Sequence, residues 1–367
     1  MLKSLRLRNF KGFQSQELDF KPVTLLAGLN SSGKSSVIQA LLLLRQIESD
    51  SHNPEHIRLN LQGPYTRLGT GRDVLCESAD EDELEIDVTF EDGVTTGVRF
   101  SYDATADRLH APMPRRLGNS PLVRLSSMHY LCAERWGPRV TYPLSKSEAE
   151  IGVGTTGELT YHYLLLHRDE KLADSSMSHP NAKTLGLLSE AQAWLGAISP
   201  GVRIDIREVP EADLAIPKFG FERTNDVASS FYRPTNVGFG LSYSLPIITV
   251  LLSAKAGSII LLENPEAHLH PKGQSELARL IALASRRLQI VVETHSDHLM
   301  NGLRVAVKEG ELLPGNVQFL YLSRAEGHSI VESPTLDADG RLSFWPEGFF
   351  DESEKALAAL IARKKQS

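Results

Sequence analysis

Cysteine is scarce in this sequence, with two residues in 367. Cys76 and Cys132 form no CxxC pair and lack the spacing of a zinc site, which excludes a disulfide framework and predicts free thiols in a reducing compartment. A secretory signal is also missing from the opening residues, because basic side chains interrupt every apolar run there, at Lys3, Arg6, Arg8 and Lys11. We therefore expect a cytoplasmic protein.

Positive charge is not in excess either, since 39 Lys and Arg stand against 46 Asp and Glu, for a net charge of −7. The bulk charge thus provides no attraction to nucleic acid or to an anionic membrane. A cluster of arginines leaves two interpretations open, a solvated face, which we favour, and a local DNA-binding strip. Its members are Arg115, Arg116, Arg124, Arg135 and Arg139.

The chain also lacks an uninterrupted apolar run that could cross a bilayer. Its most apolar stretch, residues 245–262, contains Lys255 and Gly257 and divides into a helix and a strand. No internal repeat, low-complexity tract or sustained heptad pattern occurs. We therefore expect a globular protein without a membrane partner.

A phosphate-binding motif is present. Residues 28–35 read Gly-Leu-Asn-Ser-Ser-Gly-Lys-Ser, which matches G-x-x-x-x-G-K-[ST] between a β-prone run and a helix-prone run. In such a loop the backbone N–H groups and the helix N-terminus face phosphate oxygens. Lys34 reaches the β- and γ-phosphates, and the Ser35 hydroxyl ligates Mg²⁺. The predicted nucleotide-binding residues are Gly28, Asn30, Ser31, Ser32, Gly33, Lys34, Ser35 and Ser36.

Strand and helix patterns alternate along the chain. Two alternating runs around the turn 91–93 predict a β hairpin with a wet outer face. Apolar core strands are expected at 129–133, 258–262, 288–292 and 317–322, and helical patterns lie between about 155 and 200, after 236 and at 274–285. This order predicts an α/β protein with an inserted or flanking β-rich region.

Two of the apolar strands end in residues suited to a nucleotide site. The strand 258–262 delivers Glu263, a Walker B arrangement in which the carboxylate holds Mg²⁺ directly or through water. The strand 288–292 runs into Glu293-Thr294-His295-Ser296, and His295 is placed to hydrogen-bond the γ-phosphate and sense its loss.

A second glycine-containing segment, residues 236–242, precedes the Walker B strand and opens a helix. A phosphate-facing helix start at this position is the ABC-type design, in which one protomer's signature loop closes over ATP held by the other. Gly238, Gly240 and Ser242 would then present amides and a hydroxyl to the partner's phosphate.

Three groups of residues resemble known families. The opening, residues 5–13, resembles the start of RecF/SMC-type ABC ATPases, and residues 263–271 with 293–296 resemble the OLD-like branch of prokaryotic ATPases. Residues 134–138, 236–240 and 345–350 resemble a subgroup of stand-alone proteins with a short uncharacterised C-terminal domain. The Septu ATPase family PtuA is similar as well.

The resemblance implies an ABC-type P-loop ATPase head over residues 1–367, with ATP and Mg²⁺ as cofactors. It implies a β-rich lobe at 50–125, a helical or mixed insertion at 155–230 and a small C-terminal domain at 315–367. It also implies a homodimer of heads around sandwiched ATP, and a separate effector protein in phage or plasmid defence.

The sequence departs from the family pattern at the catalytic position. Asn264 stands where a second carboxylate usually acts as base, and an amide cannot take a proton. Glu266 is the nearest substitute, as base or water-orienting group; a structural role in the turn at Pro265 is the alternative. The residues expected to be catalytic are therefore Glu266, Glu263 and His295.

Other departures concern neighbouring loops. The segment 237–242 lacks the usual serine-glycine-glycine order, and the loop after Leu131 carries Glu134 and Arg135 instead of the family's glutamine. His268 and His270 lack evident further metal ligands at suitable spacing.

The segment 337–340 superficially resembles the acidic pair of a TOPRIM nuclease. Too few residues separate it from Glu326 for the strand, helix and strand that such a site needs, so a turn is predicted there. Any nuclease should therefore be a partner protein.

Three functions remain open from the sequence. The first is an ATP-hydrolysing switch whose dimer is controlled by the γ-phosphate. The second is an ATP-bound scaffold or sensor with negligible turnover, which Asn264 favours. The third is a RecF-like DNA-repair ATPase, against which the net charge weighs.

Overall fold

A central sheet of six strands organises the protein. The computed structural model describes residues 1–49, 55–112, 125, 127–145, 152–222, 230–348 and 360–361. The strand order is β16-β15-β3-β14-β13-β9, and every neighbouring pair is parallel except β15 with β16. The bounds are β3 Val23–Gly28, β9 His129–Leu131, β13 Ile259–Glu263, β14 Gln289–Glu293, β15 Val317–Ala325 and β16 His328–Glu332.

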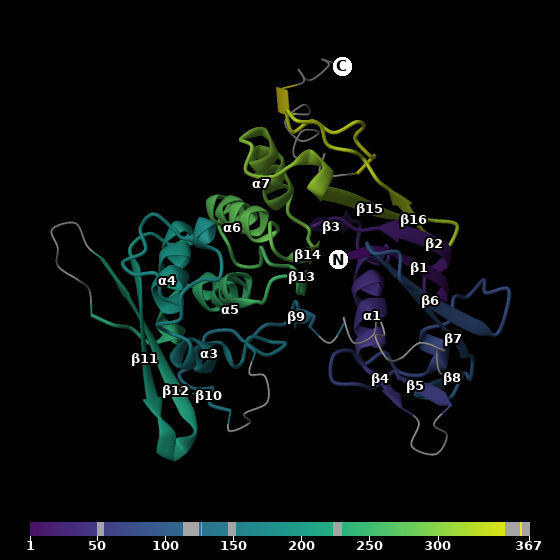
Figure 1. The fold of residues 1–367 in the computed structure, drawn as a ribbon, viewed down its shortest axis with the longest axis horizontal. Coiled ribbons are helices and arrows are strands. Elements are labelled where there is room, and N and C mark those ends of the chain that lie inside the picture. Colours follow the sequence, from purple (N-terminus) through teal and green to yellow (C-terminus); the bar gives the residue numbers. More distant parts are fainter. Residues whose placement is uncertain are drawn as a thin grey trace, which may run out of the picture.

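The inner strands β3, β13 and β14 are mostly apolar because both faces of the sheet are covered. Leu25 and Leu26 of β3 belong to two different core clusters, as do Leu262 and Leu261 of β13, since successive side chains point to opposite faces. Helix α1 (Lys34–Arg45) packs within the second cluster. The other face carries α5 (Phe239–Ser253), α6 (Pro271–Ala284) and α7 (Asp297–Lys308) (Figure 1).

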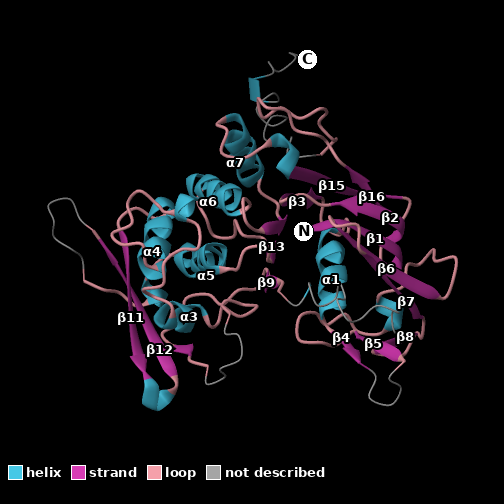
Figure 2. Ribbon diagram, in the orientation of Figure 1, coloured by secondary structure: helices cyan, strands magenta, loops and turns pink. Residues whose placement is uncertain are grey.

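An antiparallel β lobe lies beside α1, and Figure 2 shows it as the strand-rich side of the molecule. Its larger sheet has the order β2-β1-β6-β7 and its smaller sheet the order β4-β5-β8. The alternating burial of β6 is that of a half-buried strand, and β6 pairs with β7 around the turn, which confirms the predicted hairpin. The bounds are β1 Leu2–Phe10, β2 Phe13–Asp19, β4 Ile47–Ser49, β5 His56–Asn60, β6 Glu83–Phe90, β7 Thr95–Ser101 and β8 Arg108–Pro112.

The helix-rich side of the molecule carries a further small sheet with the order β10-β12-β11. Helix α4 contacts both α5 and α6 there, so this side is packed onto the face of the central sheet. The bounds are α3 Thr160–Leu166, α4 Leu187–Ile198, β10 Tyr142–Pro143, β11 Val202–Val209 and β12 Leu214–Phe221. Short 3₁₀ helices lie at Gly71–Asp73, Ser175–Met177, Pro210–Ala212, Pro234–Asn236 and Pro314–Asn316.

The α/β class and the positions of the core strands are confirmed, with ends shifted by one to three residues. The segment 337–341 forms the predicted turn, in which Asp337 Oδ1 accepts from the amides of Asp339 and Arg341. Of the arginine cluster, Arg115, Arg116 and Arg124 lie outside the described residues. Across the part of the chain that is described, no helix has the length and apolar character to cross a membrane.

Candidate nucleotide-binding site

The phosphate loop lies between the end of β3 and the start of α1, as the motif predicts. Gly28 and Gly33 have positive φ angles of 138° and 106°, which side chains rarely tolerate. A Cβ on Gly28 would also overlap the carbonyl oxygen of Leu322 in β15. Gly33 is the N-cap of α1, and the first amides of this helix therefore open into the loop.

Lys34 is held inside the loop. Its Nζ donates to the carbonyl oxygens of Gly28 at 3.0 Å and Leu29 at 2.6 Å, and the residue is 4% exposed. Burial lowers the pKa of Lys34, and the nearby carboxylate of Glu293 opposes that shift. A bound phosphate would offer this ammonium a charged partner in place of two neutral carbonyls.

The other predicted loop residues differ in how they are placed. Asn30 and Ser31 are exposed, and Ser31 has a φ of 61°. Ser32 is buried, and its hydroxyl oxygen has no hydrogen-bond partner among the described residues. Ser35 and Ser36 lie in the first turn of α1, and both line the cavity described next.

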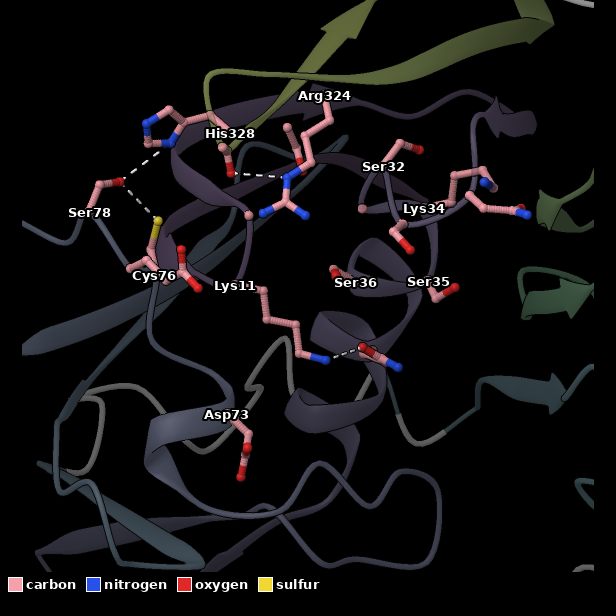
Figure 3. Close-up of a pocket in the computed structure, with 18 of the residues that line it drawn as sticks. Lys11, Ser32, Lys34, Ser35, Ser36, Asp73, Cys76, Ser78, Arg324 and His328 are labelled. Carbon is pink, nitrogen blue, oxygen red and sulfur yellow. Dashed lines mark hydrogen bonds between the residues drawn. The ribbon is translucent and has the colours of Figure 1, made fainter.

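A cavity of about 790 Å³ opens along the loop. This volume is within the range of small-molecule and cofactor sites. Figure 3 shows that its wall combines α1 and the phosphate loop with Lys11, with residues around Asp73 and Cys76, and with Arg324 and His328 of the β15–β16 hairpin. The cavity therefore extends well beyond the motif, over a length that base and ribose could occupy.

Two parts of this wall were not found from the sequence. Lys11 Nζ donates to Gln39 Oε1 on α1 at 2.6 Å, and the Ser78 hydroxyl lies 3.4 Å from His328 Nδ1. These side chains come from segments far apart in the chain, and no local pattern links them. The β15–β16 hairpin is brought to the loop by the pairing of β15 with β3.

Glu293 is the side chain that the structure brings to Ser35. The Ser35 hydroxyl donates to Glu293 Oε1 at 2.8 Å, and Glu293 Oε2 is buried without a hydrogen-bond partner among the described residues. Burial raises the pKa of Glu293 to about 7, the hydrogen bond from Ser35 opposes the shift, and the charges of Glu263 and Glu266 add to it. The sequence signal was available, because β14, like β13, ends in a glutamate.

Glu263 makes other contacts. Its Oε1 accepts from the Tyr130 hydroxyl at 3.1 Å and its Oε2 from the Ala133 amide at 3.0 Å. Burial raises the pKa of this carboxyl, while both hydrogen bonds lower it. Glu263 is not among the residues that line the cavity.

Arg135 lies in the loop after β9, the candidate loop that carries no counterpart of the family's glutamine. The residue is 2% exposed, and its guanidinium donates to the carbonyl oxygens of Cys132, Glu263 and Asn264. Arg135 therefore links the loop after β9 to the end of β13 by hydrogen bonds.

Glu266 lies in the loop after β13 and reaches the loop after β14. Its Oε1 accepts from the His295 amide at 2.8 Å, while its Oε2 and Asn264 Oδ1 are buried without partners among the described residues. The His295 side chain lines the cavity. Partial burial lowers the pKa of His295, and the positive charge of Lys34 lowers it further. A neutral imidazole that can accept or donate a hydrogen bond therefore lies beside the phosphate loop.

The glycine-containing segment before β13 forms the exposed start of α5. Gly238 is the N-cap, Phe239 is 52% exposed, and Gly240 packs against the His268 backbone in the loop after β13. Ser242 is placed differently from our expectation. It is 4% exposed and lies close to Tyr161, so its hydroxyl is not presented at the surface.

The residues present suit a magnesium–nucleotide complex. A hydroxyl, a carboxylate with one unused oxygen and a buried ammonium converge on the start of α1. Mg²⁺ in nucleotide sites commonly takes one or two carboxylate or hydroxyl oxygens together with phosphate oxygens and water.

Comparison with protein families gives two matches. The family described as "AAA domain, putative AbiEii toxin, Type IV TA system" matches residues 23–301. A family described as "Protein of unknown function (DUF3696)" matches residues 312–360, in agreement with the resemblance of the C-terminal segment.

Individual relatives are more distant. The chain is 41% identical over 63 residues to the DNA replication and repair protein RecF of Cyanothece sp., which is 17% of each chain. It therefore spans about a sixth of the length of that curated relative.

Two solved structures share the fold. One is the Smc head bound to the C-winged helix domain of ScpA, with a TM-score of 0.52 and 16% identity over 92% of this chain and 98% of that one. The other is the Pyrococcus furiosus Smc head bound to the C-terminal domain of ScpA, with a TM-score of 0.51 and 12% identity over 98% and 99%. These likenesses show that the chain has the fold of an Smc head.

Proposed function

The chain belongs to the family of P-loop ATPase domains whose model covers residues 23–301, and we propose that it is a nucleotide-dependent dimerising switch. In this proposal two heads close around ATP and Mg²⁺, hydrolysis releases them, and the assembled state controls a separate effector protein in phage or plasmid defence. The observation that carries the proposal is the phosphate loop with Lys34 and Ser35 in a nucleotide-sized cavity.

Each group of the site has a distinct task. Lys34 exchanges its loop carbonyls for the β- and γ-phosphates, and the amides at the start of α1 bind the phosphate oxygens. Mg²⁺, held from the Ser35 side, neutralises charge on the phosphates. Glu266, fixed by the His295 amide, orients or deprotonates the attacking water, and the His295 ring contacts the γ-phosphate.

The second half of the proposal concerns the dimer. The start of α5 presents an exposed helix N-terminus with Gly238 as its N-cap. A second head could place its ATP there, which agrees with the ABC-type fold. A partner protein is supported by the two similar heads, each of which is described as bound to a domain of ScpA.

The runner-up is an ATP-bound scaffold with little turnover. Asn264, which cannot accept a proton, is the observation that favours it. A RecF-like action on DNA is supported by the 63-residue likeness to RecF, and it predicts ATPase activity that rises with DNA and binding that weakens with salt.

Phosphate release from ATP and Mg²⁺, measured beside the molar mass in solution, tests the proposal. The wild type should hydrolyse ATP and double its mass with a non-hydrolysable analogue, and Lys34→Ala should do neither. Dimers without phosphate release would favour the scaffold. Turnover that Lys34→Ala leaves unchanged would contradict the whole assignment.

The defence role needs a cellular test. A gene cluster carrying the wild-type chain should lower phage or plasmid yield, and the same cluster with Lys34→Ala should not. Equal protection by both would separate the biological role from nucleotide binding and overturn the switch.

A further inference from the structure

Two glutamates, Glu263 and Glu293, are candidates for the carboxylate that lies beside Ser35. Glu263 ends β13 and Glu293 ends β14, and the two residues are paired in register in the central sheet. β14 pairs directly with β3, the strand that leads into the phosphate loop, whereas β13 is one strand farther away. Neighbouring strands are about 4.8 Å apart, so the strand order alone places Glu293 nearer to the loop.

The contacts agree with this order. Ser35 Oγ donates to Glu293 Oε1 at 2.8 Å, and Glu293 lines the cavity together with Ser35 and His295. Both oxygens of Glu263 are already bonded, to the Tyr130 hydroxyl and the Ala133 amide.

The free oxygen of Glu293 points to a missing ligand. The residue is 6% exposed, and its Oε2 is fully buried without a hydrogen-bond partner among the described residues. Leaving a buried carboxyl oxygen without a partner is costly, and a bound cation is one ligand that would satisfy it. A divalent cation would occupy that position without displacing any hydrogen bond of Glu263.

We propose that Glu293, with the Ser35 hydroxyl, provides the protein ligands of the nucleotide-bound divalent cation, and that Glu263 is a positioning residue. This rests on the proposed nucleotide site. The Ser35 oxygen and the Glu293 carboxylate would hold the cation, which would neutralise charge on the phosphates. Glu263 instead ties the end of β13 to the loop after β9 through Ala133, where Arg135 also binds.

The test compares Glu293→Gln with Glu263→Gln, a matched pair at the same register of neighbouring strands. Binding of a fluorescent, non-hydrolysable ATP analogue is titrated with Mg²⁺ and with EDTA, and Mn²⁺ bound to the protein–nucleotide complex is counted by electron paramagnetic resonance. Wild type and Glu263→Gln should bind the analogue more tightly with Mg²⁺. Glu293→Gln should lose that gain and bind Mn²⁺ roughly 10–100-fold more weakly.

Binding without metal provides the second readout. Glu293→Gln removes a negative charge beside the phosphates, so it should bind the metal-free analogue at least as tightly as the wild type. A Gln side chain still accepts the Ser35 hydrogen bond, and thermal unfolding checks that both variants are folded.

The outcomes separate two failures. If Glu293→Gln keeps the Mg²⁺ gain and Glu263→Gln loses it, Glu263 is the metal carboxylate and only this inference is overturned. If the wild type binds the analogue but shows no Mg²⁺ gain, this inference and the role of Mg²⁺ in the proposed function are both overturned, while nucleotide binding stands. If the wild type binds no nucleotide under either condition, the proposed function fails first and takes this inference with it.

Discussion

The two glycine-containing helix starts of this protein are built in opposite ways. The loop before α1 is enclosed by its own chain. The Leu322 carbonyl of β15 lies close to Gly28, Lys34 is buried, and Glu293 accepts a hydrogen bond from Ser35. The start of α5 is open, since Gly238 is exposed and, among the described residues beyond its chain neighbours, none approaches within 4 Å of the position its Cβ would take. The first segment is thus enclosed within its own chain, and the second is open at the surface.

The largest expected effect is on the unfolding free energy, when one glycine in each segment is replaced by alanine. Gly28→Ala should lose about 3–5 kcal/mol of unfolding free energy, since the φ of 138° and the Leu322 carbonyl both oppose a Cβ. Gly238→Ala should change it by less than about 0.5 kcal/mol, because its φ is −63° and the space is open. Denaturant unfolding measures both, and equal losses would show that the two segments do not differ as described.

The loop after β13 contacts the start of α5 through His268, and through Glu266 it contacts the loop after β14, whose His295 lines the cavity. Glu266→Gln should keep nucleotide binding and lower ATP turnover on the order of 10²-fold, the usual contribution of a general base. Single-turnover phosphate release measures this change. Unchanged turnover would leave Glu266 a structural role in its turn.

A charge at the open segment should act on assembly alone. Gly238→Asp would face the partner's triphosphate in the proposed dimer and weaken ATP-dependent dimerisation by about tenfold or more, with Gly238→Ala as the matched control. Binding of ATP by the single head should stay as in the wild type. Sedimentation with a non-hydrolysable analogue measures the dimer, and an intact dimer would exclude α5 from the interface.

The smallest expected effect is a pH dependence in the enclosed pocket. The pKa of Glu293 is raised to about 7 in the folded protein, so its contribution to stability is greatest below the ordinary carboxyl value of 4.5. That contribution is lost as the pH rises to 7. Without metal and nucleotide, Glu293→Gln should therefore melt a few degrees above the wild type at pH 8, and the difference should vanish towards pH 5.

Melting curves at several pH values test this, with Glu17→Gln on the exposed face of β2 as control. A constant difference across the range would mean that Glu293 is ionised throughout.

Local patterns predicted much of the molecule. The phosphate loop was placed between its strand and helix because the motif and its apolar flanks are contiguous, and β13, β14 and α5 followed from the same kind of signal. The α/β class also follows from the order of elements, since an apolar strand needs cover on both faces.

Tertiary structure decided what contiguous patterns cannot contain. Both Glu263 and Glu293 end an apolar strand, and only the sheet order places β14 next to β3 and Glu293 against Ser35. The burial of Ser242 follows from the packing of α5. The far wall of the cavity likewise depends on β15 pairing with β3, a contact between residues about 290 positions apart. The sequence by itself determined the kinds of groups in the site, and long-range strand pairing determined which of them meet.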